Sequence, residues 1–270
     1  MSSYNELARQ ILEGTSLPDK LISLSEIQFN DWISYDLPTL PGRKDKIQFT
    51  DERVKFPKAP KIFENESKAI ALHSFANHEL LAIEMMAAAI LYYPHHTEEE
   101  IRYKKGMVKA LTDEQKHFSL YVQRINELGY EFGDFPVNDF FWKQMPKLNN
   151  IQNFTALMSL TFEAANLDFA QYYRDLFLDS GDKVTADILD IVLEDEISHV
   201  AFGSYWLKRW RGDKTLWDYY LSVLPYPLTP ARSKGIHFDQ EIHRKAMSDD
   251  HFIEELTQYD DPFRVTKRRL

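Results

Sequence analysis

The chain has 270 residues, of which 44% are hydrophobic and 27% are charged, and its formal net charge is −10. This composition is typical of a globular protein and excludes collagen-like, low-complexity and disordered chains. The acidic balance argues against a general phosphate-binding surface, because nucleic-acid affinity depends largely on clustered Lys and Arg. Because the sequence has no cysteine, disulfides, thiolate-bound iron–sulfur clusters and thiol catalysis are excluded.

The sequence also bears on the compartment. Residues 1–13 lack the apolar core of a signal peptide. The longest apolar stretch, residues 85–93, is too short to span a bilayer. We therefore expect a cytoplasmic protein that does not enter a membrane. Local basic groups leave room for a small RNA contact, and these are Lys208, Arg209, Arg211, Lys267, Arg268 and Arg269.

The first quarter of the chain predicts one helix and an arm. Apolar residues at helical spacing predict a short helix over residues 4–12, which ends near Gly14. Pro18 begins a further helical turn. Between residues 31 and 64, prolines are scattered among charged residues, which predicts an extended arm that wraps a core.

Four long helices are predicted next, over residues 67–93, 97–129, 151–179 and 183–210. Pro94 stops the first helix, and Thr97 with Glu100 forms a capping box that opens the second. Gly181 closes the third helix, and Gly212 lies just beyond the fourth. A short helix, a proline-rich turn and a helix over residues 237–247 complete the chain.

Loop lengths predict the topology. Short links make the first two helices one antiparallel pair and the last two another, whereas residues 130–150 are long enough to cross a bundle. Two hairpins joined by one long crossover form a ferritin-like four-helix bundle. The expected fold class is all-α, with an N-terminal helix and arm (1–64), the bundle (65–212) and a C-terminal extension packed on it (213–270).

One motif occurs twice. Residues 113–117 and 195–199 both read Asp-Glu-x-x-His, in the second and fourth predicted helices. Three residues of separation place the Glu and the His on one helix face, one turn apart, so both can reach one metal ion. The motifs thus supply four candidate ligands, which are Glu114, His117, Glu196 and His199.

The other two helices each carry a glutamate within an apolar stretch. Glu84 and Glu163 would be costly to bury unless a cation such as a divalent metal compensates the charge. The two motifs lie 82 positions apart and these glutamates lie 79 apart, which indicates a duplicated helical hairpin. Glu79 competes with Glu84, but five positions turn a helix by about 140°, so both cannot face one centre equally. The duplication favours Glu84.

The predicted site therefore contains four carboxylates and two imidazoles, namely Glu84, Glu114, His117, Glu163, Glu196 and His199. Oxygen and nitrogen ligands of this kind suit iron or manganese. The layout matches that of ferritin-like di-iron and di-manganese carboxylate proteins, which predicts two metal ions, with iron preferred. Asp113 and Asp195 could each accept a hydrogen bond from a ligand histidine of the opposing helix.

Each of these residues also has a structural interpretation that involves no metal ion. The motif residues could be surface carboxylates and histidines at the edge of a core. His73 and Asn77 could line a channel toward the metals, although we interpret them as satisfied polar groups near a bundle end. Tyr121, one turn beyond His117, could donate a proton, but an ordinary core aromatic is the preferred interpretation.

Four segments resemble a bacterial ferritin-like family that is catalogued as a domain of unknown function. They are residues 78–84, 113–118, 132–139 and 195–203, and the similarity extends through residues 230–232. The resemblance implies a ferritin-like fold and a centre of two metal ions. More distantly, the chain is similar to ferritin-like hydroxylases, including one that modifies tRNA, which implies oxygen activation.

Two classes of function follow from this site. The first is an oxygen-activating oxidase or hydroxylase that acts on a small molecule with dioxygen or peroxide. It takes electrons from an external donor or from the substrate itself. The alternative is a metal-binding protein without substrate turnover, which serves as a ferroxidase or detoxifies peroxide. The arm and the C-terminal extension argue against a storage cage, so we expect a monomer or a dimer. The third hypothesis is a structural helical module whose metal site is degenerate.

Overall fold

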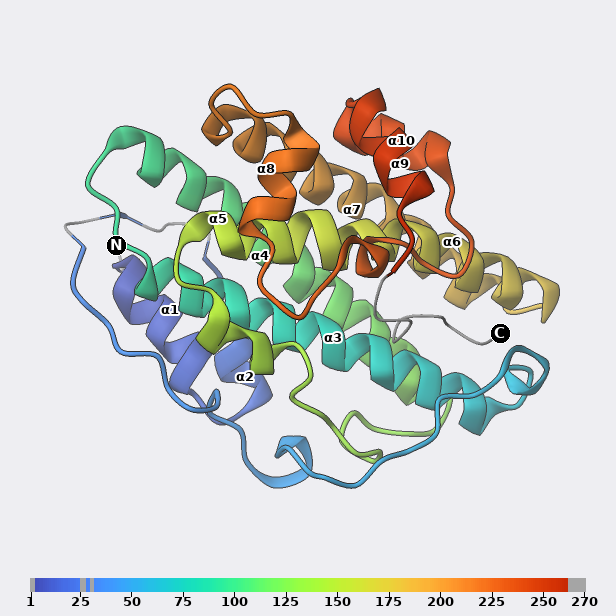
Figure 1. The fold of residues 1–270 in the computed structure, drawn as a ribbon. Coiled ribbons are helices and arrows are strands. Elements are labelled where there is room, and N and C mark those ends of the chain that lie inside the picture. Colours follow the sequence, from blue (N-terminus) through green and yellow to red (C-terminus); the bar gives the residue numbers. More distant parts are fainter. Residues whose placement is uncertain (1–2, 25–27, 30–31, 262–270) are drawn as a thin grey trace. The chain divides into compact units, whose positions relative to one another are not determined.

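The computed structural model describes residues 3–24, 28–29 and 32–261 (Figure 1). Within these ranges the chain forms helices and connecting segments without a β-strand, so the predicted all-α class is confirmed. The predicted basic residues at 267–269 lie outside the described ranges. No helix in the described part is long and apolar enough to cross a membrane. The chain divides into two compact units, Met1–Pro146 and Lys147–Leu270, called here the N-terminal and C-terminal units.

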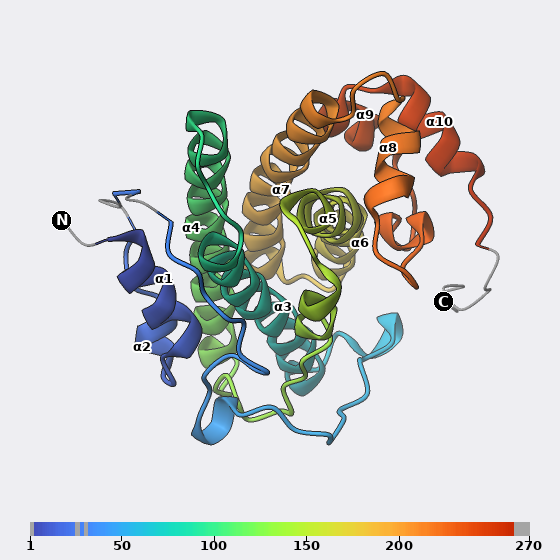
Figure 2. The same ribbon diagram turned by 60° about the vertical axis from the view of Figure 1, so that its left-hand side comes forward.

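A long helical hairpin forms the centre of the N-terminal unit. The helices of this unit are α1 (Tyr4–Glu13), α2 (Leu17–Lys20), the 3-10 turns η1 (Asp45–Ile47) and η2 (Ala59–Lys61), α3 (Asn65–Tyr92) and α4 (Glu98–Glu127), and the 3-10 segment η3 (Trp142–Lys147) begins at its end. The helices α3 and α4 pack along each other, and α1 packs against α3 (Figures 1 and 2). The structure thus confirms the first predicted hairpin and the short helix before it.

The sequence explains where these helices begin. Thr97 accepts a hydrogen bond from the backbone of Glu100, whose side chain in turn accepts from the backbone of Thr97, so the predicted capping box opens α4. Ser3 and Glu6 form the same box at α1. The arm before α3 is irregular as predicted, apart from the turns η1 and η2.

A second hairpin forms the centre of the C-terminal unit. Its elements are α5 (Ile151–Leu157), the π-helical segment η4 (Met158–Glu163), α6 (Ala164–Asp179), α7 (Lys183–Trp210), α8 (Leu216–Val223), the 3-10 turn η5 (Pro230–Ser233), α9 (Gln240–Met247) and α10 (Asp250–Gln258). Within this unit α6 packs along α7, while α8 and α9 also contact α7 (Figure 2). The bounds predicted for the fourth long helix are those of α7, whereas the sequence did not predict α10.

The third predicted helix contains a change of helix type. The segments α5, η4 and α6 follow one another without a break, but Met158–Glu163 is π-helical. Thr161 Oγ1 donates a hydrogen bond to the carbonyl oxygen of Ala156, at 2.8 Å. This bond satisfies a backbone acceptor next to the wider turn, where helical hydrogen bonds change register.

Gly203 allows α7 to approach the π-helical segment closely. A Cβ atom at this position would lie 2.2 Å from the Cβ of Ser159, which is closer than two carbon atoms can pack. The apolar side chains around this contact form the core of the unit, with Leu160 and Val200 fully buried. A glycine seven residues after Glu196 therefore serves packing within the unit that holds the second motif.

Candidate metal centre

The N-terminal unit holds three of its acidic and imidazole side chains close together. Glu79 comes from α3, and Glu114 and His117 come from α4. All three are buried, and one ligand atom of each lies within 4.8 Å of the others. The Oε2 atom of Glu114 lies 3.6 Å from Nδ1 of His117, as the i, i+3 spacing requires. This cluster is called here the N-terminal triad.

The C-terminal unit holds an equivalent set, the C-terminal triad. Glu163 ends the π-helical segment, and Glu196 and His199 lie on α7. These side chains are also buried, with ligand atoms within 4.8 Å of one another. The Oε2 atom of Glu196 lies 3.6 Å from Nδ1 of His199, the distance also found in the N-terminal triad.

Glu196 provides a test of whether the C-terminal triad suits a cation. Its Oε1 atom accepts a hydrogen bond from Nδ2 of Asn166, at 2.8 Å. Its Oε2 atom is buried and accepts no hydrogen bond from any described residue. A buried carboxylate oxygen in this state is costly, and a bound cation would remove that cost. Clusters of buried carboxylates and histidines of this kind could hold metal ions.

Glu84, which the sequence favoured as a ligand, lies elsewhere in the N-terminal unit. Its Oε2 atom lies 2.7 Å from Nη2 of Arg43, and its Oε1 atom lies 3.1 Å from Nζ of Lys20. All three side chains are almost fully buried. The charge of Glu84 is therefore balanced by two cations from outside the hairpin, while Glu79 takes the place beside Glu114 and His117.

Positions along the helix axes could have distinguished Glu79 from Glu84 at the level of the sequence. In the antiparallel pair α3–α4, Glu114 lies 16 residues after the start of α4, and Glu79 lies 13 residues before the end of α3. The difference of three residues corresponds to about 4.5 Å along the helix axis. Glu84 lies only 8 residues before that end, which gives a mismatch of about 12 Å. In the other hairpin, Glu163 and Glu196 also differ by three residues.

Burial also shifts the pKa of the lysine beside Glu84. Removal from water lowers the pKa of Lys20, and the charge of Glu84 acts in the opposite direction. Lys20 Nζ also donates to the carbonyl oxygens of Ile11 and Leu12 at the end of α1, at 2.7 and 3.3 Å. Lys20 and Arg43 were not predicted, because their sequence neighbourhoods carry no periodic or motif signal.

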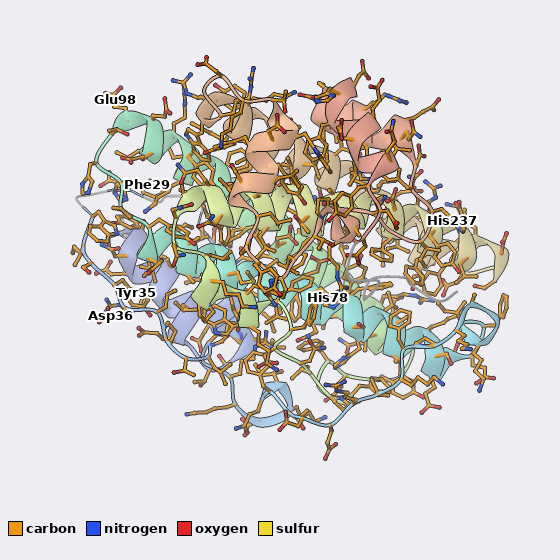
Figure 3. All side chains as sticks on the ribbon, in the orientation of Figure 1. Phe29, Tyr35, Asp36, His78, Glu98 and His237 are labelled. Carbon is orange, nitrogen blue, oxygen red and sulfur yellow. The ribbon has the colours of Figure 1, made fainter. Side chains whose placement is uncertain are left out.

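The polar residues considered as channel groups lie on the same helix as Glu79. His73 and Asn77 are buried, and His78 immediately precedes Glu79 on α3 (Figure 3). His73, Asn77 and His78 line a cavity within the N-terminal unit. Tyr121 is buried, and its ring centroid lies 5.8 Å from that of Phe75, which agrees with the preferred reading as a core aromatic.

These observations define an all-helical protein with buried clusters of carboxylates and histidines that could hold metal ions. The chain matches, over residues 6–254, a family described as "Protein of unknown function (DUF455)", and it belongs to that family. It is also 30% identical over 146 residues to an uncharacterized protein of Haemophilus influenzae. That match covers 52% of this chain and 51% of the relative, so the chain spans about half of its length. No solved structure matches the chain significantly.

Proposed function

We propose that the two triads together hold a dinuclear iron centre and that the protein is an oxygen-activating oxidase or hydroxylase. In this proposal the hairpins α3–α4 and α5–α7 pack as a ferritin-like four-helix bundle, with the triads facing its centre. The proposed ligands are Glu79, Glu114, His117, Glu163, Glu196 and His199. Glu79 replaces Glu84 in this set because Glu84 is paired with Lys20 and Arg43.

The observation that carries the proposal is the equivalence of the triads. Each consists of one glutamate from the first helix of a hairpin and one Glu-x-x-His motif from the second. The carboxylate and imidazole of each motif lie 3.6 Å apart. Two equal sets of two carboxylates and one imidazole are the donors expected of a di-iron or di-manganese carboxylate centre.

The protein residues would perform separate tasks in such a centre. The four glutamates offset the charge of two divalent ions, and the two histidines supply neutral nitrogen ligands through Nδ1. Asn166 orients Glu196 through the hydrogen bond to Oε1, so its other oxygen is left for a cation. Hydrogen bonds from His117 and His199 to the aspartates of the opposing motifs stay a prediction. When bound, a pair of iron ions supplies the capacity to activate dioxygen.

Metal stoichiometry is the first test. The chain is purified without a tag, loaded with Fe(II) or Mn(II) without oxygen, desalted, and analysed for metal per chain. We expect two iron ions per chain, and at most one in a Glu196→Gln variant. Fewer than one equivalent of either metal in the wild type would contradict the proposal and favour a degenerate site.

Reaction with oxygen separates the enzyme from the alternatives. The reduced iron protein is mixed with oxygenated buffer, and oxygen uptake and absorbance are followed. Uptake that resumes only when more Fe(II) is added supports a ferroxidase, and a large hollow assembly in solution supports storage. Continued uptake with a small-molecule electron donor supports an oxidase. We expect continued uptake by a monomer or a dimer.

A further inference from the structure

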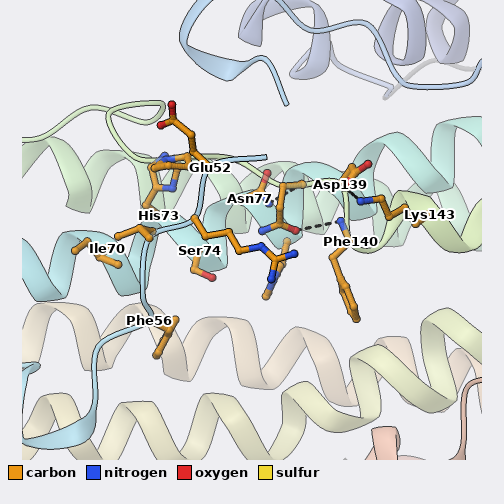
Figure 4. A pocket seen from close by; sticks show the side chains of 14 residues that line it. Glu52, Phe56, Ile70, His73, Ser74, Asn77, Asp139, Phe140 and Lys143 are labelled. Atoms are coloured by element: carbon orange, nitrogen blue, oxygen red, sulfur yellow. Dashed lines mark hydrogen bonds and ion pairs between the residues drawn. The ribbon is translucent and has the colours of Figure 1, made fainter. Parts of the chain in front are cut away.

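A cavity of about 470 Å³ lies within the N-terminal unit. It is open to solvent on one side and is bordered by the first half of α3, by the arm around Phe56, and by the loop that precedes η3 (Figure 4). This volume is within the range of small-molecule sites. One of the residues that line it, His78, directly precedes Glu79 of the N-terminal triad.

His73, one of the residues that line this cavity, carries a hydrogen-bond donor on a ring of fixed orientation. The backbone N–H of Gly133 donates to Nε2 of His73, at 2.9 Å, so Nε2 is an acceptor and the hydrogen of the neutral ring lies on Nδ1. Burial lowers the pKa of His73 to about 4, which keeps the ring neutral at pH 7. Among the described residues, none accepts a hydrogen bond from Nδ1.

The backbone at Gly133 supports this arrangement. Gly133 has a φ of +100°, and a Cβ atom there would lie 2.6 Å from the Cβ of Lys46. The ring of His73 is stacked on Phe132, with 4.6 Å between their centroids. His73 is therefore fixed on one side by a ring and at Nε2 by a backbone donor, and its orientation does not depend on a ligand.

Two further features of the lining are suited to contact a ligand. The hydroxyl of Ser74, next to His73 on α3, makes no hydrogen bond with any described residue. Phe56 and Phe140 border the same space, and Phe140 is 44% exposed (Figure 4). Hydroxyl and ring-nitrogen donors beside phenyl rings favour a ligand that is aromatic and carries a hydrogen-bond acceptor.

The charges around the cavity cancel. Its lining includes two carboxylates, Glu52 and Asp139, and two cations, Arg53 and Lys143. Asp139 Oδ1 lies 2.7 Å from Nζ of Lys143, so these two charges neutralise each other directly. A lining with equal numbers of both charges does not favour a ligand of either sign.

We infer that this cavity binds a small, uncharged aromatic molecule that carries a hydrogen-bond acceptor such as a carbonyl oxygen. The acceptor receives hydrogen bonds from His73 Nδ1 and the Ser74 hydroxyl, and the aromatic ring of the ligand contacts Phe56 and Phe140. A role of this cavity as the substrate pocket of the enzyme rests on the proposed function. It is based on the lining residue His78, which adjoins the proposed metal ligand Glu79 in the sequence. As a binding site it does not require a metal.

Binding is tested with three fluorinated probes by ¹⁹F NMR, on metal-free and iron-loaded full-length protein. They are 4-fluoroacetophenone, 4-fluoroethylbenzene, which lacks the carbonyl, and 4-fluorobenzylammonium, which is charged. We expect the ketone to bind about tenfold more tightly than the hydrocarbon, as one hydrogen bond would provide. No detectable ketone binding, or equal or tighter binding of either other probe, would overturn the inference.

Two variants locate the preference. His73→Phe keeps a flat ring but removes the ring-nitrogen donor. Ser74→Ala removes the hydroxyl and keeps the hydrogen bond from the Gly133 backbone to the His73 ring. We expect each to reduce the ketone preference, and His251→Phe, on the exposed face of α10, to leave it unchanged. An unchanged preference in both cavity variants would also overturn the inference. Metal content is measured on the same samples, so failure of the di-iron proposal is seen separately from failure of ligand binding.

Discussion

Arg43 and Glu84 form a buried ion pair with two hydrogen bonds. Nε of Arg43 donates to Oε1 at 3.0 Å, and Nη2 donates to Oε2 at 2.7 Å. The guanidinium also lies 4.3 Å from the ring centroid of Phe49 and donates to Oδ1 of Asn77 at 3.2 Å. The arm is thus attached to α3 through the buried carboxylate of Glu84. The charge of Glu84 is thus balanced within the N-terminal unit by Arg43 and Lys20.

Glu84→Gln should destabilise the protein without removing metal. The amide keeps the shape of the side chain but leaves the charges of Lys20 and Arg43 buried without a counter-ion. Loss of one partner of a buried ion pair costs about 3–5 kcal/mol. We expect a decrease of that size in the free energy of unfolding, measured with urea, and an unchanged metal content per chain.

Glu79→Gln is the matched control and should have the opposite effects. We expect metal content to fall and the stability of the metal-free protein to change by less than about 1 kcal/mol, because a buried carboxylate in a cluster of acids is itself unfavourable. If Glu84→Gln lost the metal and Glu79→Gln retained it, the assignment of these two glutamates would have to be reversed.

His73 predicts a pH dependence of stability. Its pKa is lowered from 6.5 to about 4, first by burial, while the charge of Asp134 acts in the opposite direction. Between pH 6.5 and 4 the unfolded chain therefore binds a proton that the folded chain does not. The free energy of unfolding falls as the pH decreases through this window, by about 3 kcal/mol from this group. Above pH 6.5 the contribution is constant.

Urea unfolding of the metal-free protein at pH 7 and pH 4.5 tests this contribution against His73→Phe. Carboxylates affect both proteins alike, so the difference between them isolates His73. The variant should be the less stable protein at pH 7, and its deficit should shrink toward pH 4.5. A deficit that is the same at both values would show that His73 titrates normally.

The helices could be predicted because their signals are local. Apolar periodicity, Pro94, Gly181 and the Thr97 capping box lie within the segments that they define, and the structure confirms each hairpin. The π-helical turn could not be read in this way, because its sequence is an ordinary apolar helical stretch. The segment contacts α7, and its Thr161 contacts Tyr220 of α8, and both helices are distant from it in the chain.

In the candidate site, too, the features that belong to one helix could be predicted from the sequence, whereas those that depend on packing between segments could not. The spacing within each Glu-x-x-His motif is a property of one helix, and the 3.6 Å contacts follow from it. The choice between Glu79 and Glu84 depends on the level of α3 relative to α4, and on the arm residues that balance Glu84. The duplication argument compared positions along the chain without allowing for the unequal hairpin links, and so it favoured Glu84.

Tyr220→Phe should weaken the C-terminal unit through the π-helical segment. The hydroxyl of Tyr220 is buried and lies 2.8 Å from both Thr161 Oγ1 and Ser233 Oγ. Its removal takes a hydrogen-bond partner from two buried hydroxyls. The expected loss is about 1–3 kcal/mol in the free energy of unfolding. Because Thr161 lies two residues before Glu163, we also expect weaker iron binding.

Tyr219→Phe provides the control for this change. Tyr219 is the adjacent residue on α8 and is only half-buried, so the same loss of a hydroxyl should alter stability by less than about 0.5 kcal/mol. Equal effects of the two substitutions would mean that the Thr161–Tyr220–Ser233 contacts do not support the segment.

Gly203→Ala should separate α7 from the π-helical segment. The new methyl group would lie 2.2 Å from Ser159 Cβ and 2.9 Å from Leu160 Cδ1, and neither the buried serine nor the helix backbone can move freely. Overpacking of a core typically costs about 1–3 kcal/mol. This loss outweighs the gain of up to about 1 kcal/mol from replacing glycine in a helix. We therefore expect a net decrease in stability.

The displacement of α7 in Gly203→Ala should also weaken metal binding. Movement of α7 away from Ser159 shifts Glu196 and His199 relative to Glu163, so we expect Gly203→Ala to bind iron more weakly than the wild type. Ser198→Ala, at an exposed position of α7 beside His199, introduces no contact of this kind and should retain wild-type stability and iron content. A stabilised Gly203→Ala protein with full iron content would show that the approach of α7 to this segment is not needed for the C-terminal triad.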